Sequence, residues 1–260
     1  MKEYESIETV YVRNPDTHVL EFGNLRIPEV ETIKSWVVTE KIDGMNIRVI
    51  FTWDGARMRA DVRGRTDKAI LPEGMVAAVL QYFDWNNTIE AFFMLGKPGT
   101  VTFYGEGFGE GIQKNPLRLA GKRFRVFDIA VGQDRLHWLS DADVRGILKR
   151  VSLDGTVGVQ AVPIVGLIDK LPRTESDLRL LLPASHVATE PNVQPEGIVC
   201  RPVVPLLNSR GERIIWKLTY REYAKWNAHL MQQVQVDLEA MKGAGTPVYD
   251  SYAPDVPVVS

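Results

Sequence analysis

The sequence predicts an α+β fold built from mainly antiparallel sheets with flanking helices. Short β-rich segments and amphipathic segments are mixed along the chain, without the steady strand–helix alternation of a parallel sheet. Asp-Gly pairs at 43–44 and 54–55 lie between β-rich segments, where antiparallel hairpins often place their turns. With 260 residues, of which 45% are hydrophobic, the chain can bury a sizeable core as one large domain or two small ones.

The first half of the chain contains strands and one expected helix. Residues 36–52 and 56–64 are β-rich, and two further β-rich segments cover 100–106 and 122–131. A Gly-rich loop, GEGFGEGIQKN, separates the last two segments. A helix is expected over 73–95, because the following apolar residues lie close to helical spacing: Met75, Val76, Val79, Leu80, Phe83 and Ile89.

The second half of the chain has clearer helix boundaries. Ser140 is placed to cap a helix over 141–151, because acidic residues fill its first turn. Thr174 is placed to cap a shorter helix, ESDLRLLL, which ends before Pro183. Two β-rich segments, EGIVCRPV and RIIWKL, follow.

The last part of the chain predicts a long helix and a tail. The helix is expected from about Tyr220 to Met241 and should end before Gly243. Residues 243–260 are rich in Pro and Gly and are expected to form a flexible tail on the surface. We therefore predict one domain over 1–242.

Composition excludes several classes of protein. The net charge of −2 argues against binding of nucleic acid by electrostatics alone, although it allows a local basic groove. The single cysteine, Cys200, excludes an internal disulfide and a cysteine-rich zinc site and suits a reducing cytosol. The N-terminus has no apolar signal segment, and no apolar run approaches roughly eighteen residues, so we expect a cytoplasmic protein outside the membrane. Four histidines form no ligand spacing and are expected to be structural or surface residues: His18, His137, His186 and His229.

The segment VVTEKIDGMNIRVIF contains more than a turn. A hairpin explains Asp43 and Gly44, but it does not explain Glu40, Lys41 and Asn46 together. The pattern Lys-x-Asp-Gly is weak by itself. Further segments follow it in a fixed order: RGRT at 63–66, FYGEGFGEGIQ at 103–113, FRVFD at 124–128, PEGIVCRP at 195–202 and IIWKL at 214–218.

This series resembles the nucleotidyltransferase motifs I, Ia, III, IIIa, IV and V of ATP-dependent ligases and mRNA capping enzymes, over residues 37–218. Glu40, Asn46 and GEGIQ are similar to the RNA ligase 2-like branch, as is the opening YESIETVY, whereas DNA ligases usually carry Arg at the position of Asn46. The resemblance implies a nucleotidyltransferase (ATP-grasp-like ligase) domain. It also implies an ATP-dependent RNA ligase that joins 5′-phosphate and 3′-hydroxyl ends through a lysine–AMP intermediate.

The resemblance makes Lys41 the nucleophile. A free lysine has a pKa of about 10.4 and attacks phosphorus only when neutral, so desolvation, neighbouring cations or a metal must favour loss of its proton. Lys217 would hold the α-phosphate, unless it is an exposed strand lysine. Arg65 would contact that phosphate or the 5′-phosphate of the polynucleotide, with Arg63 as its rival; the dipeptide RT favours Arg65.

The resemblance also suggests roles in nucleotide recognition. Glu106 would bind the ribose hydroxyls or help to organise the metal. It follows an apolar strand, where burial of a charge without a function would cost free energy. Phe127 would stack on adenine or pack in the core, with Phe124 as the rival stacking residue and Asp128 nearby in the pocket. Glu40 would help to read adenine.

The later steps and the metal involve other residues. Asn46 would act near the reacting phosphate of the polynucleotide. Glu196 would organise a divalent metal, and Asp43 would support that site. ATP and Mg²⁺ (or Mn²⁺) are the expected cofactors, since these ions prefer carboxylate, phosphate and water ligands. RNA is the expected partner, with a nicked duplex or an RNA/DNA hybrid among the candidate substrates.

The chain departs from the family pattern in two respects. Motif V commonly reads Lys-x-Lys, whereas here Thr219 replaces the second lysine or, if Lys217 is the second, Ile215 replaces the first. One positive charge is missing, and Arg221 and Lys225 are candidates to replace it. Only about forty residues follow motif V, too few for an OB domain. We therefore expect a domain that binds RNA by its own surface or with a partner protein.

Two alternative functions remain beside the RNA ligase. A minimal DNA ligase or a capping-type guanylyltransferase would use the same lysine chemistry, but Asn46 and the expected lack of an OB domain argue against both. A nucleotide-binding module without turnover is the other alternative, and Thr219 is the residue that suggests it.

Overall fold

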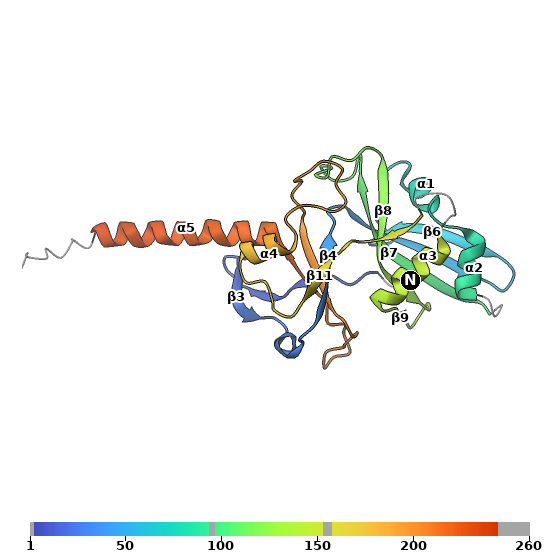
Figure 1. Ribbon diagram of the computed structural model, residues 1–260, viewed down its shortest axis with the longest axis horizontal. Helices are drawn as coiled ribbons and strands as arrows, with labels where there is room; N and C mark the ends of the chain where they lie inside the picture. The colour runs from blue at the N-terminus through green and yellow to red at the C-terminus, as the bar shows by residue number, and fades with distance from the viewer. Residues whose placement is uncertain (1–2, 94–96, 153–157, 244–260) are drawn as a thin grey trace, which may run out of the picture.

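The computed structural model describes residues 3–93, 97–152 and 158–243. Two main sheets, one of five strands and one of six, lie side by side, and β2 and β3 form a separate two-stranded sheet (Figure 1). Among the described strand pairs, only β1 with β13 and β10 with β8 are parallel. The predicted α+β fold of mainly antiparallel sheets with flanking helices is confirmed.

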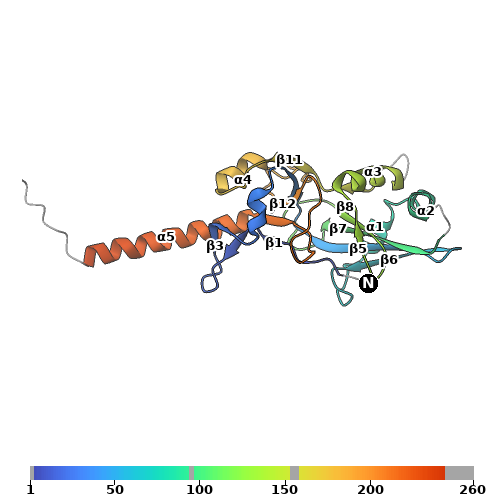
Figure 2. The ribbon, with the colours of Figure 1, turned by 90° about the horizontal axis from the view of Figure 1, so that it is seen from below.

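The six-stranded sheet carries helices on one face (Figure 2). Its strand order is β10-β8-β7-β5-β6, with β9 paired to β8. Apolar side chains of the sheet and of these helices form one core, with Phe51, Phe103 and Leu148 among its buried members. The strands are β5 (Met45–Trp53), β6 (Met58–Gly64), β7 (Gly99–Gly109), β8 (Lys122–Val131), β9 (His137–Trp138) and β10 (Gln160–Ala161), and the helices are α1 (Met75–Leu80), α2 (Trp85–Phe93) and α3 (Asp141–Val151).

The five-stranded sheet has a second core, in which the rings of Trp36 and Trp216 pack edge to face on each other. Its strand order is β1-β13-β12-β4-β11. The strands are β1 (Glu8–Thr9), β4 (Trp36–Lys41), β11 (Ile164–Ile168), β12 (Gly197–Pro202) and β13 (Trp216–Thr219). Around this core lie β2 (Tyr11–Arg13), β3 (Leu20–Leu25), η1 (Pro28–Thr32), α4 (Glu175–Leu181) and the start of α5 (Tyr220–Gly243).

The Asp43–Gly44 turn links the two sheets and is not the turn of a hairpin. β4 pairs with β11 and β12, whereas β5 pairs with β6 and β7, so the hairpin interpretation of this turn was wrong. Gly44 is needed for close approach, because a Cβ there would lie 2.3 Å from the carbonyl oxygen of Gly107. The link therefore lies directly against β7 of the other sheet.

The second Asp-Gly pair does form the expected hairpin turn, between β5 and β6. The Oδ1 atom of Asp54 accepts hydrogen bonds from the backbone N–H groups of Ala56 and Arg57, at 2.9 and 2.8 Å. A short polar side chain that bonds to the backbone two residues ahead is a common turn-former.

The single helix expected over 73–95 is two helices, α1 and α2, so that prediction was wrong. Asp84 lies between them, and its Oδ1 accepts a hydrogen bond from the backbone N–H of Asn87 at 2.8 Å. Such a contact starts a new helix and competes with continuation of the preceding one. Residues 94 and 95 lie outside the described residues.

The starts of the remaining predicted helices are confirmed. The side chain of Ser140 accepts from the backbone of Asp143 at the start of α3, and Thr174 with Asp177 forms a capping box at the start of α4. Helix α5 begins at Tyr220 as expected, but it includes Gly243, so the expectation that it ends before this glycine was wrong. The tail was predicted over 243–260; Gly243 belongs to α5, and the rest lies outside the described residues. In the part of the chain that the structure describes, no helix is long and apolar enough to cross a membrane.

Candidate active site

A cavity of about 410 Å³ lies where strands of the two main sheets meet. This volume is within the range of small-molecule sites. Its lining brings together most of the predicted site residues, namely Glu40, Lys41, Asn46, Arg65, Glu106, Phe127 and Lys217. Apart from Glu40, Lys41 and the nearby Asn46, these residues are far apart along the chain, so the fold creates the cluster.

Lys41 is the last residue of β4, and its Nζ lies 2.5 Å from Oε2 of Glu196. The strand register explains this contact, because Lys41 pairs with Gly197 and Glu196 directly precedes it. The two side chains are 26% and 28% exposed, so the ion pair is within reach of solvent. Lys217 lies close by on β13, and burial together with the charge of Lys41 lowers its pKa.

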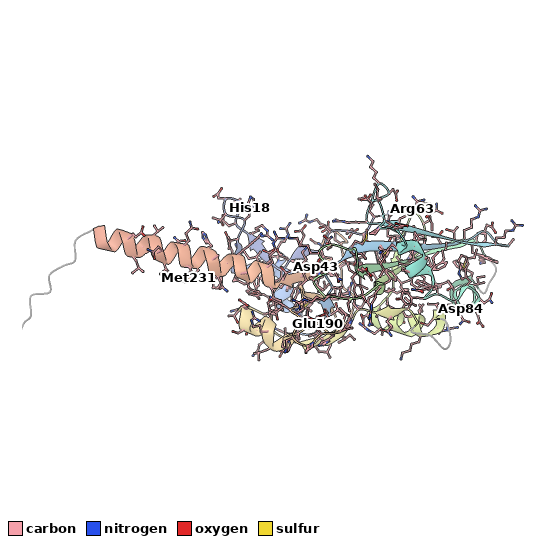
Figure 3. The ribbon with its side chains drawn as sticks, turned by 90° about the horizontal axis from the view of Figure 1, so that it is seen from above. His18, Asp43, Arg63, Asp84, Glu190 and Met231 are labelled. Carbon is pink, nitrogen blue, oxygen red and sulfur yellow. The ribbon has the colours of Figure 1, made fainter. Side chains whose placement is uncertain are left out.

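Three carboxylates lie close enough to influence one another. Burial raises the pKa of Glu106 to about 8, with Glu196 and Asp43 adding to the rise and Lys41 opposing it. Burial also raises the pKa of Glu196, against the opposing effect of Lys41. Neither Glu196 nor Asp43 is among the residues that line the cavity; Asp43 lies in the link between the sheets, near the middle of the molecule (Figure 3).

These carboxylates are suited to a metal ion that takes its other ligands from water and from substrate phosphates. Among the described residues, no group of three or more His, Cys, Asp or Glu side chains is arranged to hold a metal alone. Mg²⁺ is usually held by one or two carboxylates and completed by water and substrate phosphates. Glu196 and Asp43 lie close enough for the charge of one to affect the other, so two carboxylates are available here to an ion of that kind.

The two rival phenylalanines lie in different environments. Phe124 is buried in the core of the six-stranded sheet, and a Cβ on Gly105 would lie 2.4 Å from its ring. Phe127 lines the cavity and packs edge to face on Tyr4, with ring centroids 4.9 Å apart. Val199 lines the same cavity, so apolar walls suited to a flat base are present.

Asp128 does not line the cavity and is 3% exposed, so the expectation of its place in the pocket was wrong. Its Oδ2 accepts hydrogen bonds from the Tyr4 hydroxyl at 2.6 Å and from Arg213 at 2.7 Å, with Arg201 at 3.4 Å. The guanidinium of Arg213 also lies over the ring of Trp138, 3.6 Å from its centroid. The carboxylate therefore neutralises part of the charge of two poorly exposed arginines.

Replacing Asp128 with alanine should lower the free energy of unfolding by about 3–5 kcal/mol, because both arginines lose their counter-charge. Urea denaturation measures this loss. Asp61→Ala is the matched control, since Asp61 pairs with Arg63 at the surface and its loss should cost about 1 kcal/mol or less. Equal stability of the two variants would show that the Asp128 network does not stabilise the fold.

Glu40 is 2% exposed and is already hydrogen-bonded within the protein. One oxygen accepts from the Ser185 hydroxyl at 2.5 Å, and the other accepts from the backbone N–H of His186 at 2.8 Å. Burial raises its pKa, while these two hydrogen bonds oppose the rise. Glu40 therefore ties the loop at 185–186 to β4, and its proposed contact with adenine would add to these bonds.

The rival arginines also differ. Arg65 lines the cavity, whereas Arg63 is held at the surface by Asp61 and by Asp67, the latter at 3.4 Å. Figure 3 shows Arg63 on the outer side of the six-stranded sheet. Of the two, only Arg65 is available to a ligand in the cavity.

Comparison with protein families extends this description. A family model for RNA ligases matches residues 34–219, which include Lys41, Glu196 and Lys217. The chain belongs to the RNA ligase family. No curated protein matches the sequence.

Solved structures share the fold of this RNA ligase family member. Each is an RNA ligase of Naegleria gruberi with 22% identity to the chain. A point mutant with ATP and Mn has a TM-score of 0.55, over 86% of this chain and 57% of that one. A second point mutant with AMP and Mn gives 0.52 over 84% and 60%, and a structure with PPi gives 0.54 over 88% and 65%. The chain thus spans less than two thirds of the length of these structures, and the likeness establishes the fold.

Motif V is one of the two segments in which the sequence suggested a departure from the family pattern. Lys217 lines the cavity, whereas Thr219 is buried and does not. Arg221 and Lys225 do not line the cavity, so neither replaces the missing lysine there. Arg201 is among the lining residues, although its guanidinium is paired with Asp128.

Other cavity residues were also missed. Residues 4–7 line the cavity, although they precede the first motif by more than a strand. Gln113 lines it too, and its Nε2 donates to the carbonyl oxygen of Gly44 at 3.2 Å. Both lie in quoted segments, YESIETVY and GEGIQ, but neither segment by itself indicates which side chain faces a ligand.

A larger groove, of about 900 Å³, is lined by residues of η1, β11 and α4. Its charged lining is mixed in sign, with Lys34, Lys170 and Arg173 beside Glu31, Asp169 and Asp177. None of the predicted site residues lines this groove, so its size does not make it the candidate active site.

Proposed function

We propose that this protein is an ATP-dependent RNA ligase that joins 5′-phosphate and 3′-hydroxyl ends through a lysine–AMP intermediate. The observation that carries the proposal is the position of Lys41, whose amine lies at a cavity lined by three further cations, Arg65, Arg201 and Lys217. Membership of the RNA ligase family supports it. Further support comes from the likeness to an RNA ligase solved with ATP, AMP and PPi.

In this proposal the nucleotide base lies between Phe127 and Val199, close to Glu40, and Glu106 contacts the ribose or helps to organise the metal. Lys217 holds the α-phosphate. The Nζ–P bond of Lys41 forms as the bond between the α-phosphorus and its bridging oxygen breaks, and pyrophosphate leaves. The ammonium of Lys41 has no lone pair, so one N–H bond must break first and the proton pass to water, which reaches this partly exposed pair. Separation from the Glu196 carboxylate favours that loss, because a neighbouring anion stabilises the charged form.

Glu196, supported by Asp43, would hold Mg²⁺ or Mn²⁺ together with the phosphates of ATP. When bound, the ion would neutralise phosphate charge. With its carboxylate engaged in this way, Glu196 would no longer hold the ammonium of Lys41.

The wider context is part of the same proposal. We infer a role in RNA repair in the cytoplasm, on a nicked duplex or an RNA/DNA hybrid. A partner protein would help to hold the RNA. The negative net charge supports this last inference, because the domain lacks the general excess of basic residues with which many proteins bind nucleic acid alone.

The test is to incubate the protein with α-labelled ATP or GTP and a divalent ion, and then with nicked RNA, DNA and hybrid duplexes. We expect covalent label from ATP and sealing of RNA. Transfer from GTP would favour a capping-type enzyme, and preferential sealing of DNA would favour a DNA ligase. Nucleotide binding without covalent label would favour a module that has lost turnover.

Asn46 should matter more for sealing than for charging Lys41. Its Oδ1 is buried and has no hydrogen-bond partner among the described residues, although Asn46 lines the cavity. An unpaired buried amide is poised to bond a ligand, and an amide can both donate and accept without adding charge. Asn46→Ala should therefore slow single-turnover sealing of pre-adenylated RNA about 30- to 900-fold, equivalent to about 2–4 kcal/mol.

Lysine–AMP formation by the same variant is the internal control, and it should fall much less. Normal sealing with a collapse of ATP-dependent charging would assign Asn46 to the nucleotide step and contradict this prediction.

A further inference from the structure

Arg48 is a charged residue in the middle of the six-stranded sheet, and its side chain is 0% exposed. It follows Asn46 by two positions in β5, so the two side chains lie on the same face of the sheet. Its neighbours across the sheet are Arg63 in β6 and Tyr104 in β7. A buried charge is costly unless it is paired and fully hydrogen-bonded. The burial of the Arg48 charge therefore needs an explanation.

The guanidinium of Arg48 binds the short loop that carries Arg65, on both sides of that residue. Its Nε donates to the carbonyl oxygen of Gly64 at 2.8 Å, and its Nη2 donates to Oδ1 of Asp67 at 2.7 Å. A backbone hydrogen bond from Ala69 to Thr66, at 3.2 Å, closes the turn. The loop 64–67 is thus tied to β5, the strand that carries Asn46.

The pairing of Arg48 is poor for a residue kept only for stability. Its ionic partner Asp67 is 49% exposed and is shared with Arg63. The remaining nitrogen, Nη1, is buried without a hydrogen-bond partner among the described residues. Buried ion pairs can often be replaced by well-packed apolar side chains without loss of stability. These observations point to a positional role.

We propose that Arg48 is a positioning residue that holds the loop 64–67 so that Arg65 faces the cavity. Arg48 does not line the cavity itself, so it acts through Arg65 and not by touching substrate. The inference rests on the proposed function, in which Arg65 binds a phosphate of ATP or of the RNA end. Small displacements of such a group are expensive, since a shift of about 1 Å can cost about 100-fold in rate.

The test compares Arg48→Met with Arg65→Ala in lysine–AMP formation and in sealing of pre-adenylated RNA. Arg48→Met should keep the melting temperature near that of the wild type but slow the step that Arg65→Ala slows, by about 10- to 100-fold. The double variant should be no slower than Arg65→Ala alone, because both changes remove one interaction. Arg59→Met is the control, since Arg59 is exposed on the neighbouring strand β6 and should leave both steps unchanged.

A second measurement does not depend on activity. Hydrogen exchange of the backbone amides at 64–69 should be faster in Arg48→Met than in the wild type or Arg59→Met. A wild type without covalent label or sealing would overturn the proposed function, while the exchange result would still decide whether Arg48 holds the loop.

Asp67→Ala covers the case in which Arg48→Met does not fold. It removes one of the two anchoring bonds from the exposed side and should slow the same step to a smaller extent. Any of four results would overturn the proposal. Three concern a folded Arg48→Met: normal rates, unchanged exchange at 64–69, or losses that add to those of Arg65→Ala in the double variant. The fourth applies if Arg48→Met is unfolded, and it is a normal rate in a folded Asp67→Ala.

Discussion

Lys41→Ala should abolish the covalent transfer of AMP from ATP to the protein. Loss of the nucleophile removes the group that forms the new bond, and by analogy with other covalent enzymes the rate should fall on the order of 10⁴- to 10⁶-fold. The fold should survive, because the Lys41–Glu196 pair is partly exposed and such pairs contribute little to stability. The measurement is covalent label after incubation with α-labelled ATP and Mg²⁺, with mass spectrometry of the labelled peptide.

Two variants sharpen this experiment. Lys41→Arg keeps the positive charge but stays protonated, so it should also fail to take up label. Lys149→Ala is the control, since Lys149 is exposed on α3 and lies outside the candidate active site. Label on a lysine other than Lys41, or undiminished label in Lys41→Ala, would contradict the assignment of the nucleophile.

Glu196→Ala should cripple AMP transfer while the protein stays folded. The proposed metal would lose its main carboxylate, and removal of one electrostatic stabiliser of a transition state typically costs about 10²- to 10³-fold. Rates of lysine–AMP formation across a Mg²⁺ and Mn²⁺ titration measure the loss, and thermal melting checks the fold. Higher metal concentrations should restore part of the rate if the role of Glu196 is to hold the ion.

Two further variants separate a role in metal binding from a role in the fold. Glu196→Gln keeps the size of the side chain but removes its charge, and its rate of lysine–AMP formation should be nearly as low as that of Glu196→Ala. Glu190→Ala is the control, because Glu190 is 50% exposed and pairs with Arg118 at the surface. A Glu196→Ala protein that transfers AMP normally but melts at a lower temperature would assign Glu196 to the fold alone.

The elements with strong local signals were predicted correctly. α3 and α4 begin directly after Ser140 and Thr174, because each of these side chains accepts a hydrogen bond from the backbone N–H three residues ahead. The helix expected over 73–95 was wrong for a similar reason. Helical spacing continued across Asp84, but the local bond of its side chain to Asn87 starts a second helix there.

The Asp43–Gly44 turn shows where local signals are insufficient. Asp-Gly between two strands is typical of a hairpin, and the same pair at 54–55 does form one. At 43–44 the two flanking strands instead pair with partners far along the chain, so the turn joins two sheets. Only long-range pairing decides between these outcomes, and it is this link that brings Lys41 to the cavity.

The sequence by itself determined the family, the order of the motifs and the chemical groups available, because these depend on residue type and spacing along the chain. The tertiary structure alone decided which side chains meet. It brings Arg65 and not Arg63, and Phe127 and not Phe124, to the cavity. The physical reason is that strand register and sheet pairing, set by contacts between distant segments, decide which face of each strand turns toward the site.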